Sequence, residues 1–253
     1  MKFSNTSVMN FENAFRGLRN PKNSWDRSDS KFNEYYDLSK GDVTENEVKK
    51  VFPSAYVHHK ALDGYFADII GQNDLKLAQT LIKAGSEHRK FMRQIFVSVD
   101  ITAPLFWWKE FDTYKVGTVK NSCSTMHKIH VKEFTYNDFT HNGIDECGIK
   151  YQFEYYLSVL ETLRKEFNQT KDKKYWRAII EMLPDGFNMK ATVTLDYENL
   201  FGMCSKGQRR FHKLSEWSGI DYPEYPSFIK WARNLPYAQE LLFIDEVFNT
   251  QKN

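Results

Sequence analysis

The apolar residues of this chain recur at helical spacing through its middle and second half. From His58 to Gly85 they return every three or four positions, which predicts an amphipathic helix or a helix pair. The pattern breaks at Gly71–Asp74, where Asn73 or Asp74 can cap a second helical segment, and Gly85 suits a C-terminal cap. Further helices are predicted over 151–170, 173–182, 196–205, 208–217 and 225–233.

β-Branched and aromatic residues predict strands at Gln94–Ile101 and Ala191–Leu195, with a short extended stretch at Val116–Val119. Pro104 is expected to open a helix that runs to about Tyr114, because a proline in the first turn loses no needed N–H.

The first 50 residues are polar and rich in Asn, Ser and Gly, with few apolar positions. They predict an irregular N-terminal arm that ends near residue 55. From 56 to 245 helices and strands alternate without a repeat or a flexible linker. The sequence therefore predicts a single α+β domain in which helices pack on a small sheet.

Composition narrows the class of protein. The 253 residues include 35 Lys plus Arg against 33 Asp plus Glu, a net charge of +2, so binding to nucleic acid through bulk charge is not expected. Aromatic residues make up 16%, which suits planar ligands and a packed core equally. Neither an apolar run of membrane-spanning length nor a signal peptide is visible, and three spaced cysteines without CxxC predict no disulfide framework. We expect a cytoplasmic protein.

Common catalytic and cofactor-binding motifs give little information about the function. There is no GxGxxG, GxxxxGK[ST] or GxSxG pattern. His127 and His130 have a ligand-like spacing, but no second ligand pair lies near them, so we interpret them as ordinary polar histidines and predict no metal site.

Two polar clusters carry possible chemistry. The residues Ser122–Thr125 are poorly suited to a hydrophobic core. Their hydroxyls suit hydrogen bonds to a phosphate or a base carbonyl, although a plain polar turn explains them too. Arg209 and Arg210 stand at a predicted helix start, where two guanidinium groups can hold a phosphate, although a solvated face is an equal alternative. Together the clusters favour a nucleotide site over a nucleic-acid groove.

The run Leu81–Met126 resembles the flavin-dependent thymidylate synthases (ThyX family). Ala103-Pro104-Leu105-Phe106 matches the family's helix start, and Lys109-Glu110-Phe111 falls on its R-Q-W step. Towards the C-terminus, Ile179–Pro184 stands against the family's R-x-x-L-P, and His212 and Glu216 match an H-x-x-x-E helix. The resemblance extends over about residues 60–233.

The family's R-H-R-x-x-S signature aligns with Thr113–Thr118, where only Lys115 and Thr118 keep the chemistry in kind. The substrate-loop serine falls on Cys123, between Ser122 and Ser124. The family's folate-side histidine aligns with Gln94.

The resemblance implies an α+β ThyX-like fold, a homotetramer with shared active sites, and reductive methylation of dUMP to dTMP. Methylenetetrahydrofolate would supply the carbon, FAD the hydride, and NADPH would reduce the flavin. The implied substrate-binding residues are Ser122, Cys123, Ser124, Arg209, Arg210, Arg177 and Glu110. The implied cofactor-binding residues are Tyr114, Lys115, Thr118, Gln94 and His212.

Three alternatives remain open. A related flavoenzyme would modify a pyrimidine nucleotide differently, for example by hydroxymethylation, and the altered loop at Cys123 motivates this hypothesis. A non-catalytic homologue would bind a nucleotide without flavin. A binder of single-stranded nucleic acid would use the aromatic residues for stacking.

Overall fold

The computed structural model describes residues 1–60, 62–205 and 210–246 and has the predicted α+β composition. Its residues form two compact units. The first unit contains 1–4, 100–113 and 120–192, and the second contains 5–99, 114–119 and the described residues from 193 onward.

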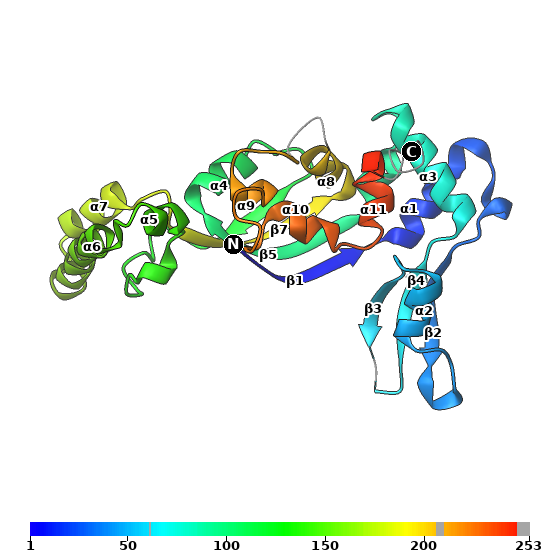
Figure 1. The fold of residues 1–253 in the computed structure, drawn as a ribbon, viewed down its shortest axis with the longest axis horizontal. Helices are drawn as coiled ribbons and strands as arrows, with labels where there is room; N and C mark the ends of the chain where they lie inside the picture. Colours follow the sequence, from blue (N-terminus) through cyan, green and yellow to red (C-terminus); the bar gives the residue numbers. More distant parts are fainter. Residues whose placement is uncertain (61, 206–209, 247–253) are drawn as a thin grey trace. The chain divides into compact units, whose positions relative to one another are not determined.

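The larger sheet has four strands in the order β1-β5-β7-β6 (Figure 1). In β5, Val97, Val99, Ile101 and Ala103 are buried at every second position, which is the period of a strand with one covered face. The strands are β1 (Lys2–Met9), β5 (Phe96–Pro104), β7 (Asn188–Asp196) and β6 (Val119–Ser122). The two strand predictions are confirmed, whereas the extended stretch at Val116–Val119 is a loop that enters β6 only at its last residue.

The first unit is mainly helical. A helix does follow Pro104, which is the N-cap of α4, but it ends at Phe111 rather than near Tyr114. The indole Nε1 of Trp108 donates to the Met189 carbonyl at 3.0 Å, which ties α4 to β7. The two long helices of this unit, α6 and α7, share one apolar cluster that contains Leu157, Leu160 and Ile179. The helices are α4 (Leu105–Phe111), η5 (Tyr136–Asp138), α5 (Asn142–Glu146), α6 (Lys150–Thr170) and α7 (Lys173–Met182). The predictions of α6 and α7 are confirmed to within one residue.

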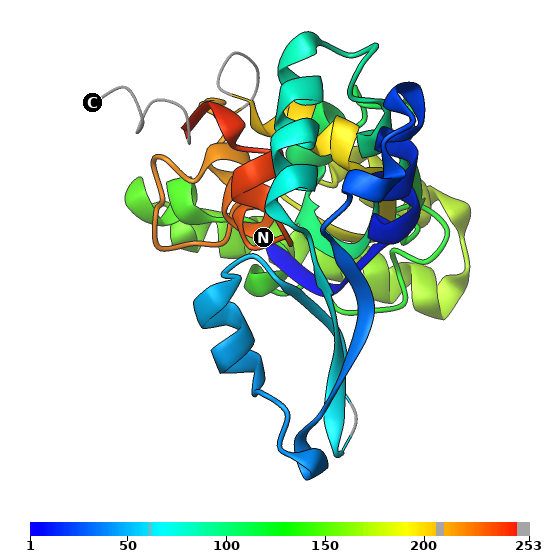
Figure 2. The same cartoon turned by 90° about the vertical axis from the view of Figure 1, so that its right-hand side faces the viewer.

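The second unit contains an antiparallel three-stranded sheet in the order β2-β4-β3, with α2 beside it (Figure 2). Tyr65, Ala67 and Ile69 of β4 pack with Val48 of α2. The elements of this part are β2 (Lys31–Asp37), η3 (Leu38–Lys40), α2 (Glu45–Val51), β3 (Tyr56–Lys60) and β4 (Gly64–Ile69).

Apart from its parts of β1, β5 and β7, the other elements of the second unit are helical. They are α1 (Phe11–Leu18), η1 (Asn20–Lys22), η2 (Trp25–Arg27), α3 (Gln72–Ala84), η4 (Lys90–Gln94), α8 (Tyr197–Cys204), α9 (Ser215–Ser218), α10 (Phe228–Arg233) and α11 (Ala238–Leu241). The predictions of α8 and α10 are confirmed. The helix expected over 208–217 begins outside the described residues, and its described part is helical only in α9.

Two predictions about the N-terminal third are wrong. Residues 1–50 are not an irregular arm, because they form β1, α1, β2 and α2. Residues 56–69 are a hairpin rather than a helix, since the alternating Tyr65, Ala67 and Ile69 find a covered face against α2. Spacings of three or four residues in so short a run did not distinguish the two structures.

The start of α3 also differs from the prediction. Neither Asn73 nor Asp74 is the N-cap, which is Gly71. The carboxylate of Asp29 instead accepts hydrogen bonds from the backbone N–H groups of Asn73 and Asp74 at 3.0–3.2 Å. A distant residue thus satisfies the free N–H groups of the first turn.

Candidate functional site

The loop from Tyr114 to Thr118, which aligns with the family signature, is held against the start of α8. The side-chain amide of Asn199 donates to the Val116 carbonyl at 2.8 Å. Gly117 has φ +75°, and a Cβ there would lie 2.9 Å from oxygens of both Asn199 and Asp196. Only glycine fits this left-handed position and this close approach. Burial raises the pKa of Asp196, and the hydrogen bond from the backbone N–H of Asn199 partly offsets this rise.

Two predicted cofactor residues meet at Trp217. The Tyr114 ring stacks on the Trp217 ring with centroids 5.9 Å apart, and His212 contacts the same ring at 5.9 Å. His212 lies before α9, and its Nδ1 accepts from the Leu214 N–H, so its spacing to Glu216 is not a helical turn. Thr118 Oγ1 is buried with no hydrogen-bond partner among the described residues.

Gln94, another predicted cofactor residue, lines a cavity of about 590 Å³ within the second unit. Leu18 and Phe91 are buried and give it apolar walls. Gly17 makes room for the Gln94 amide, because a Cβ on Gly17 would lie 3.0 Å from Gln94 Oε1. This Gln94 cavity is lined by Gly17, Leu18, Asn20, Pro21, Lys22, Leu81, Glu87, His88, Lys90, Phe91 and Gln94. Its volume falls within the usual range of small-molecule sites.

Cys123 and Ser124, two of the predicted substrate residues, line a cavity of about 220 Å³ in the first unit. Three lysines line it together with two carboxylates, Glu133 and Asp138. Lys132 pairs with Asp138 at 2.8 Å and Lys190 with Asp100 at 2.9 Å. The lining residues of this Cys123 cavity are Cys123, Ser124, Thr125, Lys128, Ile129, Lys132, Glu133, Phe134, Asp138, Phe187, Asn188, Met189 and Lys190.

The Lys128 ammonium has no carboxylate partner within the described ranges. It is therefore the cation of the Cys123 cavity that a bound anion can engage without displacing another ion pair.

Hydrogen bonds fix the Ser122–Ser124 loop, whose first residue is also the last residue of β6. The Cys123 N–H donates to the Lys190 carbonyl at 2.9 Å, which anchors the loop to β7. Ser124 Oγ accepts from the N–H groups of Met126 and His127, and its own hydroxyl hydrogen remains available to a ligand. The indole N–H of Trp176 donates to the Met126 carbonyl at 2.9 Å. The loop is thus pre-organised from two sides.

The other predicted substrate residues that the structure describes line neither cavity. Arg177 is exposed on α7, and its Nε donates to Glu181 at 2.6 Å. Glu110 is half-buried on α4. Arg209 lies outside the described residues.

Arg210 is only 4% exposed. Its guanidinium donates to both carboxylate oxygens of Asp245, to Glu246 and to the Cys204 carbonyl. These contacts occupy its donors within the second unit, so we do not include Arg210 in the proposed site.

Sequence reasoning missed the residues that make the two cavities polar. Lys128 and Lys132 follow the polar cluster Ser122–Thr125 closely in the sequence, and this closeness was the available signal. Lys190 arrives from β7, and only the pairing of β6 with β7 places it beside Cys123. Lys22 and His88 enter the Gln94 cavity from separate turns.

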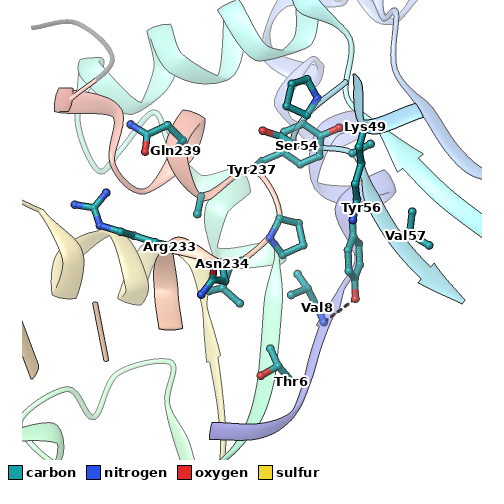
Figure 3. Close-up of a pocket in the computed structure, with 15 residues that line it drawn as sticks. Thr6, Val8, Lys49, Ser54, Tyr56, Val57, Arg233, Asn234, Tyr237 and Gln239 are labelled. Atoms are coloured by element: carbon teal, nitrogen blue, oxygen red, sulfur yellow. Dashed lines mark hydrogen bonds between the residues drawn. The ribbon is translucent and has the colours of Figure 1, made fainter. Parts of the chain in front are cut away.

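A further cavity of about 450 Å³ in the second unit holds none of the predicted site residues (Figure 3). Its two cations are already paired, Arg233 with Glu246 and Lys49 with Glu45. Ser54 donates to Glu240. It is therefore a weaker candidate for an anionic ligand than the Cys123 cavity.

The thiols give a prediction that is independent of function. Cys123 and Cys147 are exposed, whereas Cys204 is buried and burial raises its pKa to about 12. We expect a colourimetric thiol reagent at neutral pH to modify two cysteines in the native protein and the third only after denaturation. Mass spectrometry of the labelled peptides identifies them, and rapid native labelling of Cys204 would contradict the burial.

Comparison with known proteins supports the fold. A structure of the flavin-dependent thymidylate synthase ThyX from Helicobacter pylori, complexed with FAD and dUMP, matches with a TM-score of 0.59 and 12% identity over 97% of this chain and 99% of that chain. A second structure of Helicobacter pylori ThyX with FAD and dUMP matches with a TM-score of 0.57 and 12% identity, covering 97% and 98% of the two chains. The fold of this chain is therefore ThyX-like.

Other comparisons add less. The UMP/dUMP methylase PolB from Streptomyces cacaoi, bound with 5-Br UMP, has a TM-score of 0.46 and 13% identity, covering 69% of this chain and 83% of that chain. No protein-family model and no curated protein matches the sequence. Among the described helices, none has the length and apolar character needed to cross a membrane. The described residues also contain no group of three or more His, Cys, Asp or Glu side chains placed to hold a metal ion.

Proposed function

We propose that this protein is an enzyme that modifies a pyrimidine nucleotide, and specifically that it methylates dUMP reductively to dTMP. The observation that carries the proposal is the Cys123 cavity, where the predicted substrate loop meets Lys128, Lys132 and Lys190. Lysine ammonium groups and a serine hydroxyl are suitable partners for a nucleotide phosphate. The ThyX-like fold supports the choice of nucleotide, because the matched structures hold dUMP.

The described residues also include the kinds of side chain that hold a flavin. The Gln94 cavity joins apolar walls from Leu18 and Phe91 to an amide that can donate to a ring carbonyl. Lys22 and His88 bring basic groups to its lining. FAD would supply hydride transfer when bound, reduced by NADPH, with methylenetetrahydrofolate as the carbon donor.

This chain's own residues would then bind and orient the nucleotide and the flavin. Lys128 would neutralise phosphate charge, and the Ser124 hydroxyl would donate to the phosphate or to the base. Gln94 would hydrogen-bond the edge of a planar ring packed on Phe91. Because the family's active sites are shared between subunits, we propose a homotetramer as well.

Flavin loading tests the proposal first. The visible spectrum of the purified protein is recorded before and after incubation with FAD and removal of the excess. Retained flavin absorbance supports the synthase, and a colourless protein that cannot be loaded would overturn it in favour of a non-catalytic nucleotide-binding homologue.

The product mass from dUMP then separates the reactions. A gain of one methyl group supports reductive methylation. An added hydroxymethyl group supports the alternative that the thiol of Cys123 motivates, since this residue stands in place of the family's serine.

Gly17→Ala gives a matched test of the Gln94 cavity. Alanine in α1 is expected to raise the free energy of unfolding by about 0.5–1 kcal/mol, because glycine is a poor helix former. The new Cβ displaces the Gln94 amide, so flavin affinity is expected to fall about tenfold, the loss of one hydrogen bond. Urea unfolding and fluorescence titration with FAD measure the two effects. Unchanged affinity in this stable variant would remove Gln94 from the cofactor site.

A further inference from the structure

One side-chain amide in the lining of the Cys123 cavity has no part in the assignments above. Asn188 is the first residue of β7 and lines this cavity. It is half-buried, Met189 after it is buried, and Lys190 is again exposed. Side chains two positions apart project from the same face of a strand, so Asn188 lies on the face of β7 that carries Lys190.

Thr140 orients the Asn188 amide. The Thr140 hydroxyl donates to Asn188 Oδ1 at 3.0 Å. The backbone N–H of Thr140 donates to the Gly186 carbonyl at 2.8 Å, and the adjacent Phe139 pairs with Phe187 in an antiparallel bridge. Thr140 does not line the cavity. The oxygen end of the amide is therefore held by a residue outside the cavity.

The nitrogen end of the same amide is unused. Asn188 Nδ2 has no hydrogen-bond partner in the part of the chain that the structure describes. It is also accessible to solvent, unlike Thr118 Oγ1, which is buried without a partner. An amide nitrogen carries two hydrogens and cannot accept a hydrogen bond. The Cys123 cavity thus contains an oriented side-chain donor that a ligand can reach.

The other polar side chains of the lining distinguish a ligand acceptor from a ligand donor less well. A hydroxyl such as that of Ser124 can donate or accept. Lysine ammonium groups donate from flexible stems and do not fix the direction of a hydrogen bond. Asp138 already accepts from Lys132 at 2.8 Å, and Glu133 is exposed to solvent. The Asn188 amide is therefore the group best placed to recognise a carbonyl on a bound ring.

The cavity suits a single ring. Its volume of about 220 Å³ is below the usual range of about 300–1,000 Å³ for small-molecule sites, which favours a pyrimidine over a purine. Phe134 and Phe187 give it apolar walls, and their rings meet edge to face with centroids 6.5 Å apart.

The two common pyrimidines differ in the group that such a donor recognises. Uracil carries a carbonyl oxygen at ring position 4, where cytosine carries an amino group. An amide N–H donates to the carbonyl, whereas opposite the amino group two donors face each other. A donor that loses its water and gains no acceptor disfavours the wrong ligand strongly.

We infer that Asn188 selects uracil over cytosine in the bound nucleotide, and that Thr140 is a positioning residue for the Asn188 amide. The inference rests on the proposed function, because it requires the pyrimidine nucleotide to occupy the Cys123 cavity. Asn188 Nδ2 donates to the carbonyl at position 4 of the base. The Thr140 hydroxyl keeps the amide from turning over.

Calorimetric titration of the protein with dUMP and with dCMP in the presence of FAD tests the inference. The two nucleotides share the sugar and the phosphate, so the ratio of their dissociation constants reports the base alone. The unmodified protein is expected to bind dUMP about ten- to a hundredfold more tightly than dCMP. Asn188→Asp keeps the size of the side chain and replaces the donor by an acceptor. It is expected to lower this preference at least about tenfold, and its added charge, which weakens both nucleotides, cancels in the ratio.

Two threonine variants separate positioning from general structure. Thr140→Val keeps the shape and removes the hydroxyl, and it should lower the preference for dUMP about three- to tenfold. A merely structural contact would change both affinities equally. Thr194→Val is the matched control, because the Thr194 hydroxyl contacts Ser98 and Thr194 does not line the cavity. Its ratio should be unchanged.

The outcomes distinguish this inference from the proposed function. If the unmodified protein binds dUMP but does not prefer it to dCMP, or if Asn188→Asp keeps the full preference, the inference alone is overturned. If Asn188→Asp does not fold, Asn188→Ala decides, since it removes the donor without adding charge. A full preference in that variant would also overturn the inference. Absence of dUMP binding by the unmodified protein would overturn both the inference and the proposed substrate site.

Discussion

Arg210→Ala is expected to lower the free energy of unfolding by about 2–3 kcal/mol, the scale of a lost hydrogen bond to a charged group, reduced for the partial exposure of its partners. The guanidinium is almost fully buried and bridges Asp245, Glu246 and the Cys204 carbonyl. Its removal takes the donor from Asp245 and from a buried carbonyl, whereas Glu246 keeps its pair with Arg233. It also removes the cation that lies 5.1 Å from the centroid of the Phe243 ring.

Arg177→Ala is the matched control, because it removes another arginine that the resemblance assigns to the substrate. Arg177 is exposed and, within the described part of the chain, pairs with Glu181 alone, in the next turn of α7, so its loss should cost less than about 0.5 kcal/mol. Urea unfolding of both variants measures the difference. Arg210 would instead bind phosphate if Arg210→Ala kept full stability while its affinity for dUMP fell about tenfold.

Local sequence patterns predict the second half of the chain well. α6 and α7 are long and strongly periodic, and each ends where the chain offers a stop, at Lys171 in a left-handed conformation and before Pro184. β5, α4 and β7 are also correct in kind, since alternation and Pro104 act within a few residues. The ThyX-like order of elements follows from these.

The N-terminal third could not be predicted in the same way, because its stability depends on distant partners. Asp29 caps α3 from about 44 residues away, and Arg19 pairs with Asp74 over 55 residues. β4 is a strand because β2, β3 and α2 cover it, although its own apolar spacing fits a helix equally. Tertiary context overrides such weak local preference.

The candidate site likewise has a part that local sequence predicts and a part that depends on distant partners. The loop Ser122–Ser124 was found from its hydroxyls alone, because their chemistry is local. Its basic surroundings depend on Lys190, which strand pairing brings from β7. Arg210 shows the reverse case: its position in the sequence suits a phosphate, whereas the fold supplies it with two carboxylates.

Lys128→Ala is expected to weaken dUMP binding by about ten- to a hundredfold, because Lys128 is the cation in the Cys123 cavity with no carboxylate partner among the described residues. A phosphate there gains a charge-assisted hydrogen bond without breaking an existing pair. Lys132→Ala is the control, since the Lys132 ammonium is 2.8 Å from Asp138 and a ligand would compete with that carboxylate. Its effect should be about threefold or less.

Calorimetric titration with dUMP at two salt concentrations measures both variants. The Lys128→Ala loss should shrink as the salt concentration rises, because the lysine is exposed and its charge is screened. Equal losses in the two lysine variants would mean that the cavity attracts the nucleotide only through its summed charge. Unchanged affinity in Lys128→Ala would move the phosphate away from the Cys123 cavity, and with it the substrate site proposed for this fold.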